Sequence, residues 1–367
     1  MTNAAGKLEG IKVVDLSQFL PGPALTLMMA DQGAEVTKVE PAGGDPARAM
    51  APFETGENGT HSVWFTNLNR GKRSITLDLK SAAGKQAMWV LLEQADVMIE
   101  GFRPGVMKRL GFDYEAVSAR NPRIVYCSIS AFGQDGAMAH HPAHDMAVQA
   151  VAGSLSVNDG PNEIPVVPGV PSADMAAGLT GLSAVLMALI GREKSGRGDY
   201  IDCAMLDAMM PWCSHTAGTA IAGGESPRSA SQRSLGGAAF YNVYSTLDAR
   251  QIVLGGREEK FARNLLGALG MPERVEEAMR EAGEQDQLIA DLRKIFATKT
   301  RGEWVQWFAG RDVAFSPVLD YREALDSAHF AERGLWIETG GRHMIAPAIR
   351  FASQARRTVS GQVPDLS

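Results

Sequence analysis

Short apolar runs alternate with helically spaced apolar residues along the first part of the chain. The runs are rich in β-branched side chains, which is typical of buried strands, and the segments between them have the apolar spacing of helices. Strands that alternate with helices predict an α/β fold with a parallel, doubly wound sheet that binds ligands at its carboxyl edge. The predicted strands are 11–16, 34–39, 74–79, 95–99, 123–129 and 200–205, and the predicted helices are 24–32, 81–94 and the long apolar run 175–190.

A different pattern follows a stretch rich in Gly, Ser, Pro and Arg. Two strand-like segments joined by a short turn precede a series of helical patterns, which predicts a smaller α+β domain. We expect the chain to end by returning to the large domain. The predicted parts are a large domain at 1–222, a linker at 223–237, a small domain at 238–325 and the returning segment 326–367.

Composition excludes several classes of protein. The chain has 367 residues, 45% hydrophobic and 21% charged, as expected of a globular protein with more than one domain. Its net charge of −6 predicts no nucleic-acid partner. Three cysteines without CxxC spacing favour a reducing compartment. The first ten residues lack an apolar signal core, and 175–190 is shorter than the roughly 20 residues that a bilayer requires, so we expect a cytoplasmic protein without a membrane partner.

Two clusters of cations flank predicted strands. Three cations lie within 70–73, before the third strand, and Arg103, Lys108 and Arg109 follow the fourth. Such cations are suited to holding phosphates at the ligand edge of a sheet, although solvated surface charge explains them equally well. The first strand–helix turn has one Gly where the dinucleotide fingerprint needs three, and no Walker A loop is present, so neither NAD nor ATP is expected.

Candidate acid–base groups lie in the middle of the chain. Three of the seven histidines fall within 140–144, but Pro142 interrupts the helix that would align them, so no metal site is expected. His144 beside Asp145 is a candidate general base, with a hydrogen-bonded loop histidine as the alternative. Asp174 opens the apolar helix, either as an N-cap or as a reactive carboxylate. The helix dipole would lower its pKa, unless a second carboxylate such as Asp145 raises it.

Several segments, in order, carry a resemblance that covers nearly the whole chain. They include GIKVVDLSQFLPGPALTLMMADQGAEVTKVE, NRGKRSITLDLK, ADVMIEGFRPGVMKRLGF, PAHDMAVQAVAGSLS and SADMAAGLTGLSAVLMAL. In them the chain resembles the class III CoA-transferase superfamily (CaiB/BaiF type), which also contains the α-methylacyl-CoA racemases. The resemblance implies a Rossmann-like CoA-binding domain, a small domain and an interlocked homodimer. It also implies an acyl-CoA substrate, with no metal and no cofactor beyond the CoA carried in the thioester.

The resemblance also implies roles for single residues. In the family's transferases the residue matching Asp174 attacks the thioester, whereas in its racemases this Asp and a His matching His144 exchange the α-proton. His144-Asp145 and Glu258, which is similar to the racemase Glu that supports that His, favour the racemase branch. The predicted CoA-binding residues are Leu77 and Leu79 at the adenine, Lys72, Arg73 and Arg109 near the phosphates, and Arg103 from the second cation cluster.

We therefore expect an acyl-CoA racemase or epimerase, in which Asp145 tunes Asp174 and backbone N–H groups at the start of the following helix stabilise an enolate. One alternative is a CoA-transferase with Asp174 as nucleophile. The other is a non-catalytic acyl-CoA-binding protein with Asp174 as a helix cap. The Arg that often contacts a CoA phosphate after the family's second strand is missing, and Lys38 and Arg48 are candidates to replace it.

Overall fold

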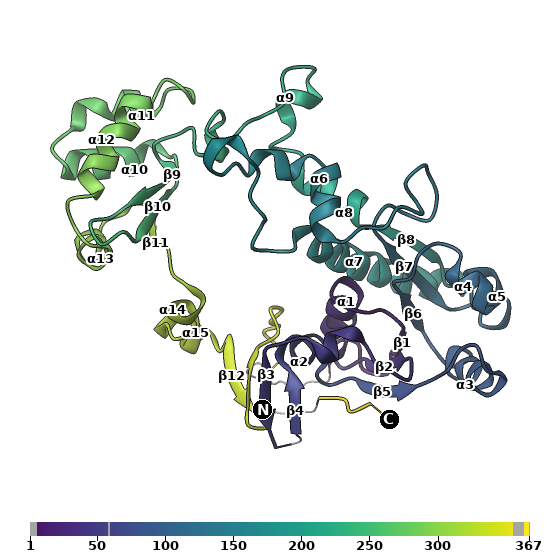
Figure 1. Cartoon of the computed structure of the whole chain (residues 1–367). Coiled ribbons are helices and arrows are strands. Elements are labelled where there is room, and N and C mark those ends of the chain that lie inside the picture. Colours follow the sequence, from purple (N-terminus) through teal and green to yellow (C-terminus); the bar gives the residue numbers. More distant parts are fainter. Residues whose placement is uncertain (1–5, 58, 355–362, 367) are drawn as a thin grey trace. The chain divides into compact units, whose positions relative to one another are not determined.

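The computed structural model describes residues 6–57, 59–354 and 363–366, and the chain divides into two compact units. Unit 1 comprises Met1–Ala152, Gly169–Trp212 and Leu325–Ser367, and unit 2 comprises Gly153–Pro168 and Cys213–Ala324. Both units can be followed by colour in Figure 1. The predicted linker 223–237 falls inside unit 2. The predicted returning segment 326–367 falls in unit 1, and its residues 355–362 and 367 lie outside the described part of the chain.

Unit 1 is built on a six-stranded parallel sheet, which confirms the predicted α/β fold and parallel sheet (Figure 1). Its strand order is β5-β2-β1-β6-β7-β8, so the direction of winding reverses between β1 and β6. Ligands of doubly wound sheets bind at this reversal, outside the carboxyl ends of the strands. The strands are β1 (Lys12–Asp15), β2 (Glu35–Glu40), β5 (Arg73–Thr76), β6 (Val97–Glu100), β7 (Val125–Ser130) and β8 (Tyr200–Ala204).

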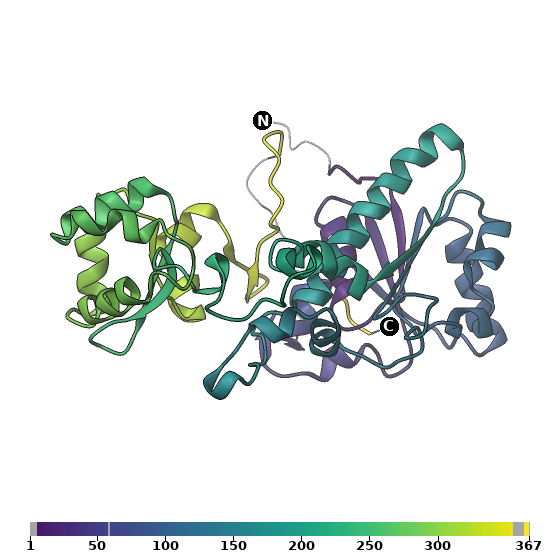
Figure 2. The same ribbon diagram turned by 90° about the horizontal axis from the view of Figure 1, so that it is seen from above.

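Helices cover both faces of this sheet. One face carries α1 (Pro21–Ala30) and α7 (Ser172–Ser195), and the other carries α3 (Ala82–Leu92), α4 (Val106–Leu110) and α5 (Tyr114–Arg120) (Figure 2). The helix predicted at 24–32 begins three residues earlier, because Pro21 has a fixed φ that suits the first helical position. The α3–α5 side buries a core that includes Val14, Met88, Leu92, Met98, Phe112, Val117 and Tyr126.

The long helix α7 runs for 24 residues, well beyond the predicted apolar run. By length and composition alone, with a mean hydropathy of 1.7, it could cross a membrane. One face nevertheless packs tightly on α1: a Cβ added at Gly178 would lie 3.0 Å from the Pro21 oxygen, and one at Gly181 would lie 2.9 Å from Leu25. The opposite face leaves Met187 and Ile190 exposed. The helix is therefore half-buried rather than enclosed.

Unit 2 contains an antiparallel sheet of order β11-β10-β9 covered by short helices. The helices enclose an aromatic core around Phe296, Trp304 and Phe308. The strands are β9 (Tyr241–Ser245), β10 (Gln251–Gly255) and β11 (Phe315–Pro317), and the helices are α9 (Gly218–Ile221), α10 (Glu259–Ala268), α11 (Val275–Ala278), α12 (Asp286–Phe296), α13 (Arg301–Phe308) and α14 (Tyr321–Leu325), the last of which ends in unit 1.

The remaining elements of unit 1 are short and lie outside the predicted pattern. They include two hairpins, of which β3–β4 lies between β2 and β5 in the chain and β12–β13 lies near its C-terminal end. Their bounds and those of the remaining helices are β3 (Phe53–Gly56), β4 (Gly59–Ser62), β12 (Trp336–Thr339), β13 (Arg342–Ile345), α2 (Val63–Asn69), α6 (Asp145–Val151), α8 (Met205–Cys213, which ends at the first residue of unit 2) and α15 (Ala328–Arg333).

A buried network of charges lies at the carboxyl end of β1. The Lys72 ammonium is 3.2 Å from Asp15 Oδ2 and also donates to Thr26 Oγ1 (2.8 Å) and Asn69 Oδ1 (2.9 Å). Burial by itself raises the pKa of Asp15, but the charges of Lys72 and Lys38, with hydroxyl hydrogen bonds, outweigh it and lower this pKa to about 2. Asp15 therefore stays ionised inside the protein.

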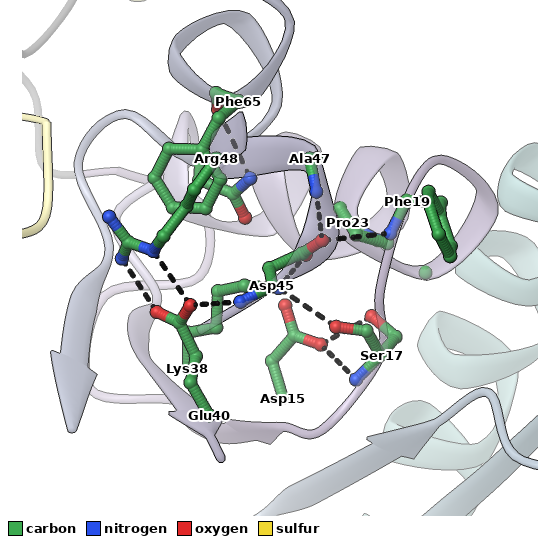
Figure 3. A network of polar contacts seen from close by, with 12 residues as sticks. Asp15, Ser17, Phe19, Pro23, Lys38, Glu40, Asp45, Ala47, Arg48 and Phe65 are labelled. Atoms are coloured by element: carbon green, nitrogen blue, oxygen red, sulfur yellow. Dashed lines mark hydrogen bonds and ion pairs between the residues drawn. The ribbon is translucent and has the colours of Figure 1, made fainter. Parts of the chain in front are cut away.

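The network continues into β2 and the loop that follows it (Figure 3). Lys38 Nζ lies 2.9 Å from Asp45 Oδ2 and donates to the Ser17 carbonyl at 2.8 Å. The Arg48 guanidinium binds both carboxylate oxygens of Glu40, at 2.7 and 2.8 Å. These contacts hold the chain after β1 against the chain after β2, at the ligand edge of the sheet.

We expect Lys72→Met to lower the free energy of unfolding by about 3–5 kcal/mol, because it leaves the Asp15 carboxylate buried and short of its partner. Urea denaturation measures this loss. The control is Glu93→Gln, which breaks the half-exposed ion pair with Arg120 and should cost less than about 1 kcal/mol. A similarly small loss for Lys72→Met would contradict a structural role for the buried pair.

Candidate active site

The start of α7 is capped from another helix. The first helical residue is Ser172, so Asp174 lies in the first turn and is not the N-cap. The Asp145 carboxylate, at the start of α6, instead accepts the N–H groups of Ala173 (2.8 Å) and Asp174 (3.1 Å) through Oδ1. The interpretation of Asp174 as a helix cap is therefore wrong, because Asp145 supplies the acceptor that free helix N–H groups require.

Both oxygens of Asp145 are engaged. Its Oδ2 accepts a hydrogen bond of 2.7 Å from Nε2 of Gln149, a buried residue one turn further along α6. Asp145 is thus a fixed negative charge at the start of α7. The expected enolate donors need correction, because the N–H groups of Ala173 and Asp174 are taken by Asp145 and that of Met175 donates to the Pro171 carbonyl at 3.1 Å.

The Asp174 carboxyl is half-buried and makes no hydrogen bond or ion pair within the described part of the chain. Burial, followed by the negative charge of Asp145, raises its pKa to about 7. These two effects outweigh the helix dipole, which acts in the opposite direction. Near neutral pH the group is therefore present in both protonation states, as acid–base catalysis requires.

His144 directly precedes α6 and is exposed. Its ring meets the ring of Phe19 edge-on, with 5.9 Å between centroids. Phe19, in the loop after β1 (Figure 3), has a φ of 61°, which is rare for a bulky side chain and is typical of functional sites. The Phe19 N–H points at Asp45 Oδ1, 3.5 Å away. The structure thus brings His144, Asp145 and Asp174 together in unit 1, beside the loop after β1.

Glu258 lies in unit 2, at the N-cap position of α10, where its side chain does not cap the helix. It lines a cavity of about 680 Å³ together with His215 and Arg257. Its predicted support of His144, a residue of unit 1, stays a prediction.

Four of the predicted CoA-binding residues follow strands at the carboxyl edge of the sheet. Leu77 and Leu79 follow β5 and are half-buried against the core. Arg103 and Arg109 follow β6, and both side chains are exposed. This edge includes the reversal of winding between β1 and β6, where a doubly wound sheet binds its ligand.

The predictions for Lys72 and Arg73 are wrong. Lys72 is fully buried and its ammonium is saturated by Asp15, Thr26 and Asn69, so no donor is left for a phosphate. Arg73 begins β5 and lines a cavity at the amino ends of the strands with Lys12 and Glu35. A residue at the start of a parallel strand and a residue after its end lie at opposite edges of the sheet. The prediction grouped the cations by their spacing along the chain and did not take this difference into account.

Neither candidate for the missing phosphate Arg is free. Lys38 is buried against Asp45, and Arg48 binds Glu40, donates to the Pro364 carbonyl at 2.9 Å and lies over the Phe65 ring. Of the cations singled out in the sequence, Arg103, Lys108 and Arg109 are therefore the exposed ones beside the ligand edge.

Comparison with known proteins decides the family. The model of CoA-transferase family III matches residues 8–366. The chain belongs to this family. It is 34% identical to the acetyl-CoA:oxalate CoA-transferase of Acetobacter aceti over 95% of this chain and 90% of that protein. It is also 34% identical to the α-methylacyl-CoA racemase of Mus musculus, over 93% of this chain and 84% of that one.

A solved structure agrees with this assignment. The crystal structure of a CAIB/BAIF family protein from Brucella suis superposes with a TM-score of 0.87 at 30% identity, covering 99% of this chain and 97% of the other. The protein is therefore an enzyme of CoA-transferase family III, a family that uses CoA thioesters as substrates. Its relatives include both transferases and racemases, so membership alone leaves the reaction open.

Asp145→Asn should lower the pKa of Asp174 below 7, because it removes the negative charge that assists burial in raising it. A ¹³C NMR titration of aspartate carboxyls, assigned by comparison with Asp174→Asn, measures the shift. Asp113→Asn is the matched control, since Asp113 also caps a helix, α5, but does not act on Asp174. An unchanged Asp174 titration in Asp145→Asn would show that the two carboxyls are not coupled.

Arg109→Ala should raise the Michaelis constant for an acyl-CoA about tenfold, which is the effect of losing one hydrogen bond to a charged group. Arg73→Ala, at the opposite edge of the sheet, is the charge-matched control and should leave the constant unchanged. Steady-state kinetics with acetyl-CoA or 2-methylacyl-CoA distinguish the two variants. Equal effects would argue against phosphate binding by Arg109.

Proposed function

We propose that this enzyme is an acyl-CoA racemase or epimerase that inverts the α-carbon of a 2-methylacyl-CoA thioester. The observation that carries the proposal is the state of Asp174, a half-buried carboxyl without a hydrogen-bond partner in the described chain and with a pKa of about 7. A group with these properties is poised both to give and to take a proton. His144, joined to the same site through Asp145, supplies the second proton-exchanging group.

The proposed reaction needs two groups on opposite faces of the substrate carbon. The imidazole of His144 takes the α-proton, and the C–H electrons move into the thioester to form an enolate. The Asp174 carboxyl then gives its proton to the other face of the α-carbon, which leaves His144 protonated and Asp174 ionised. In the reverse direction the roles exchange. Imidazole is the side chain whose ordinary titration lies nearest neutral pH, which suits this exchange.

The second candidate is a CoA-transferase. Its support is the similarity to acetyl-CoA:oxalate CoA-transferase, which extends over 95% of the chain. In this reaction a carboxylate oxygen of Asp174 attacks the thioester carbonyl, the CoA thiolate leaves, and an acyl–aspartyl anhydride forms. His144 then takes no part in the chemistry. A purely acyl-CoA-binding role has less support, because Asp174 does not serve as a helix cap.

Under either reaction CoA arrives as part of the substrate. We propose that Leu77 and Leu79 contact its adenine and that Arg109 contacts its phosphates, as the resemblance implies. We further propose that the working form is a cytoplasmic homodimer, in which Glu258 supports a catalytic histidine. The exposed apolar side chains of Met187 and Ile190 on α7 are compatible with a partner surface.

Proton NMR in D₂O distinguishes the two reactions. The protein is incubated with 2-methylacyl-CoA, and loss of the α-proton signal is followed, with a free carboxylic acid added in a parallel tube. Deuterium uptake without CoA migration is the expected result. CoA migration without uptake would replace the racemase by the transferase.

Substitutions test the two proposed catalytic groups. His144→Ala and Asp174→Ala should each slow deuterium uptake by at least about 100-fold, the usual contribution of a general acid or base. His141→Ala is the matched control, because it removes a neighbouring exposed histidine of the same loop. Normal uptake in His144→Ala would exclude the two-base reaction, whereas trapping of an acyl group on Asp174 would support the transferase.

A further inference from the structure

A second cavity of unit 1 is lined by Glu100 at the carboxyl end of β6, by Tyr126 and Ser128 within β7 and by Tyr200 at the start of β8, together with residues of α4 and α5. Its volume is about 220 Å³, enough for roughly seven water molecules. Its walls include the rings of Tyr114 and Tyr200, which are 5.3 Å apart and tilted by 33°. Asp174 and His144 do not line it. It is therefore separate from the carboxyl–histidine site described above.

The cavity is lined by a buried carboxyl group that lacks a cation. Glu100, the last residue of β6, is 4% exposed. Its Oε2 accepts the Phe102 N–H at 2.8 Å, and the Ser128 hydroxyl also donates to its carboxyl group. Within the described residues, no lysine or arginine forms an ion pair with it. A buried carboxylate without a cation is unfavourable, so this site favours a ligand that carries a positive charge.

The same cavity offers donors for an anionic group. Arg103 and Lys108 line it, and in the described part of the chain neither side chain has a hydrogen-bond or ion-pair partner. A third donor is Gln134, whose Nε2 is buried and has no partner in the structure. An unsatisfied buried donor costs free energy that an acceptor on a ligand would recover.

We propose that this cavity binds a small zwitterion, whose ammonium group pairs with Glu100 and whose carboxylate or phosphate accepts hydrogen bonds from Arg103, Lys108 and Gln134. An ω-amino acid of about seven non-hydrogen atoms matches the volume. The methylene groups of such a ligand would lie along the Tyr114 and Tyr200 rings, whose faces also attract an ammonium group.

The affinity of the cavity for such a ligand should depend on pH, because Glu100 must be ionised to bind an ammonium group. Burial, and to a smaller extent the charge of Asp202 on β8, raises the pKa of Glu100 to about 7, against the lowering effect of its hydrogen bonds. The other charged or titratable groups around the cavity are Tyr126 and Tyr200 on the sheet, Asp113, Tyr114 and Glu115 at the start of α5, and Arg103 and Lys108. An ammonium ligand needs ionised Glu100, so its affinity should rise about tenfold from pH 6 to pH 8.

Isothermal titration calorimetry of the full-length protein with 4-aminobutyrate tests the proposal. Butyrate and butylammonium each carry one of the two charges and serve as matched ligands. We expect 4-aminobutyrate to bind at least tenfold more tightly than either. No detectable binding at 10 mM, on the order of the weakest affinity such a site could use, or equal binding of butyrate would overturn the proposal.

Variants locate the site. Glu100→Gln and Arg103→Ala should each weaken 4-aminobutyrate binding at least tenfold, and Glu100→Gln should abolish the pH dependence. Glu93→Gln, at an exposed carboxyl outside the cavity, is the control and should bind normally. Because Arg103 is exposed, Arg103→Ala tests the proposal even where Glu100→Gln does not fold. Unchanged affinity in Arg103→Ala, or displacement of 4-aminobutyrate by free CoA, would overturn a separate zwitterion site.

Discussion

The buried pairing of Asp15 with Lys72 is the constraint on which the ligand edge of this protein depends. A carboxylate at the end of the central strand β1 would be too costly to bury alone, and the ammonium groups of Lys72 and Lys38 make it stable there. Because these lysines come from the segments that lead into β5 and along β2, the charges fix three neighbouring strands at the reversal of winding. Lys38 extends the network to Asp45, which approaches the strained backbone of Phe19.

A second charge, Asp145, organises the reactive side of the same unit. Its carboxylate accepts the N–H groups of Ala173 and Asp174 at the start of α7, so the Asp174 carboxyl does not have to accept a hydrogen bond from these groups. By remaining negative it helps burial to raise the pKa of Asp174. Gln149 holds the far oxygen of Asp145. Asp145 thus holds the backbone N–H of Asp174 and adds to the effect of burial on the proton affinity of its carboxyl group.

The transferase and racemase reactions require nearly the same arrangement of side chains around the substrate. Both need a CoA thioester held at the carboxyl edge and a carboxyl group of raised pKa beside it. They differ in whether a second proton-exchanging group, for which His144 is the candidate, takes part. This small difference explains how a chain can be equally similar to an acetyl-CoA:oxalate CoA-transferase and to an α-methylacyl-CoA racemase.

The sequence by itself determined the α/β class and most strands of the parallel sheet, because apolar periodicity is a local feature. Only the tertiary structure decided which cations are free. Lys72, Arg73 and Arg109 are all basic residues close to a strand in the sequence. In the structure Lys72 is buried against Asp15, Arg73 lies at the amino edge of the sheet and Arg109 lies at the ligand edge. The cap of α7 was likewise hidden, because Asp145 is 28 residues from Ala173, whose N–H it accepts. Burial and long-range pairing are properties of the folded chain, and no spacing along the sequence specifies them.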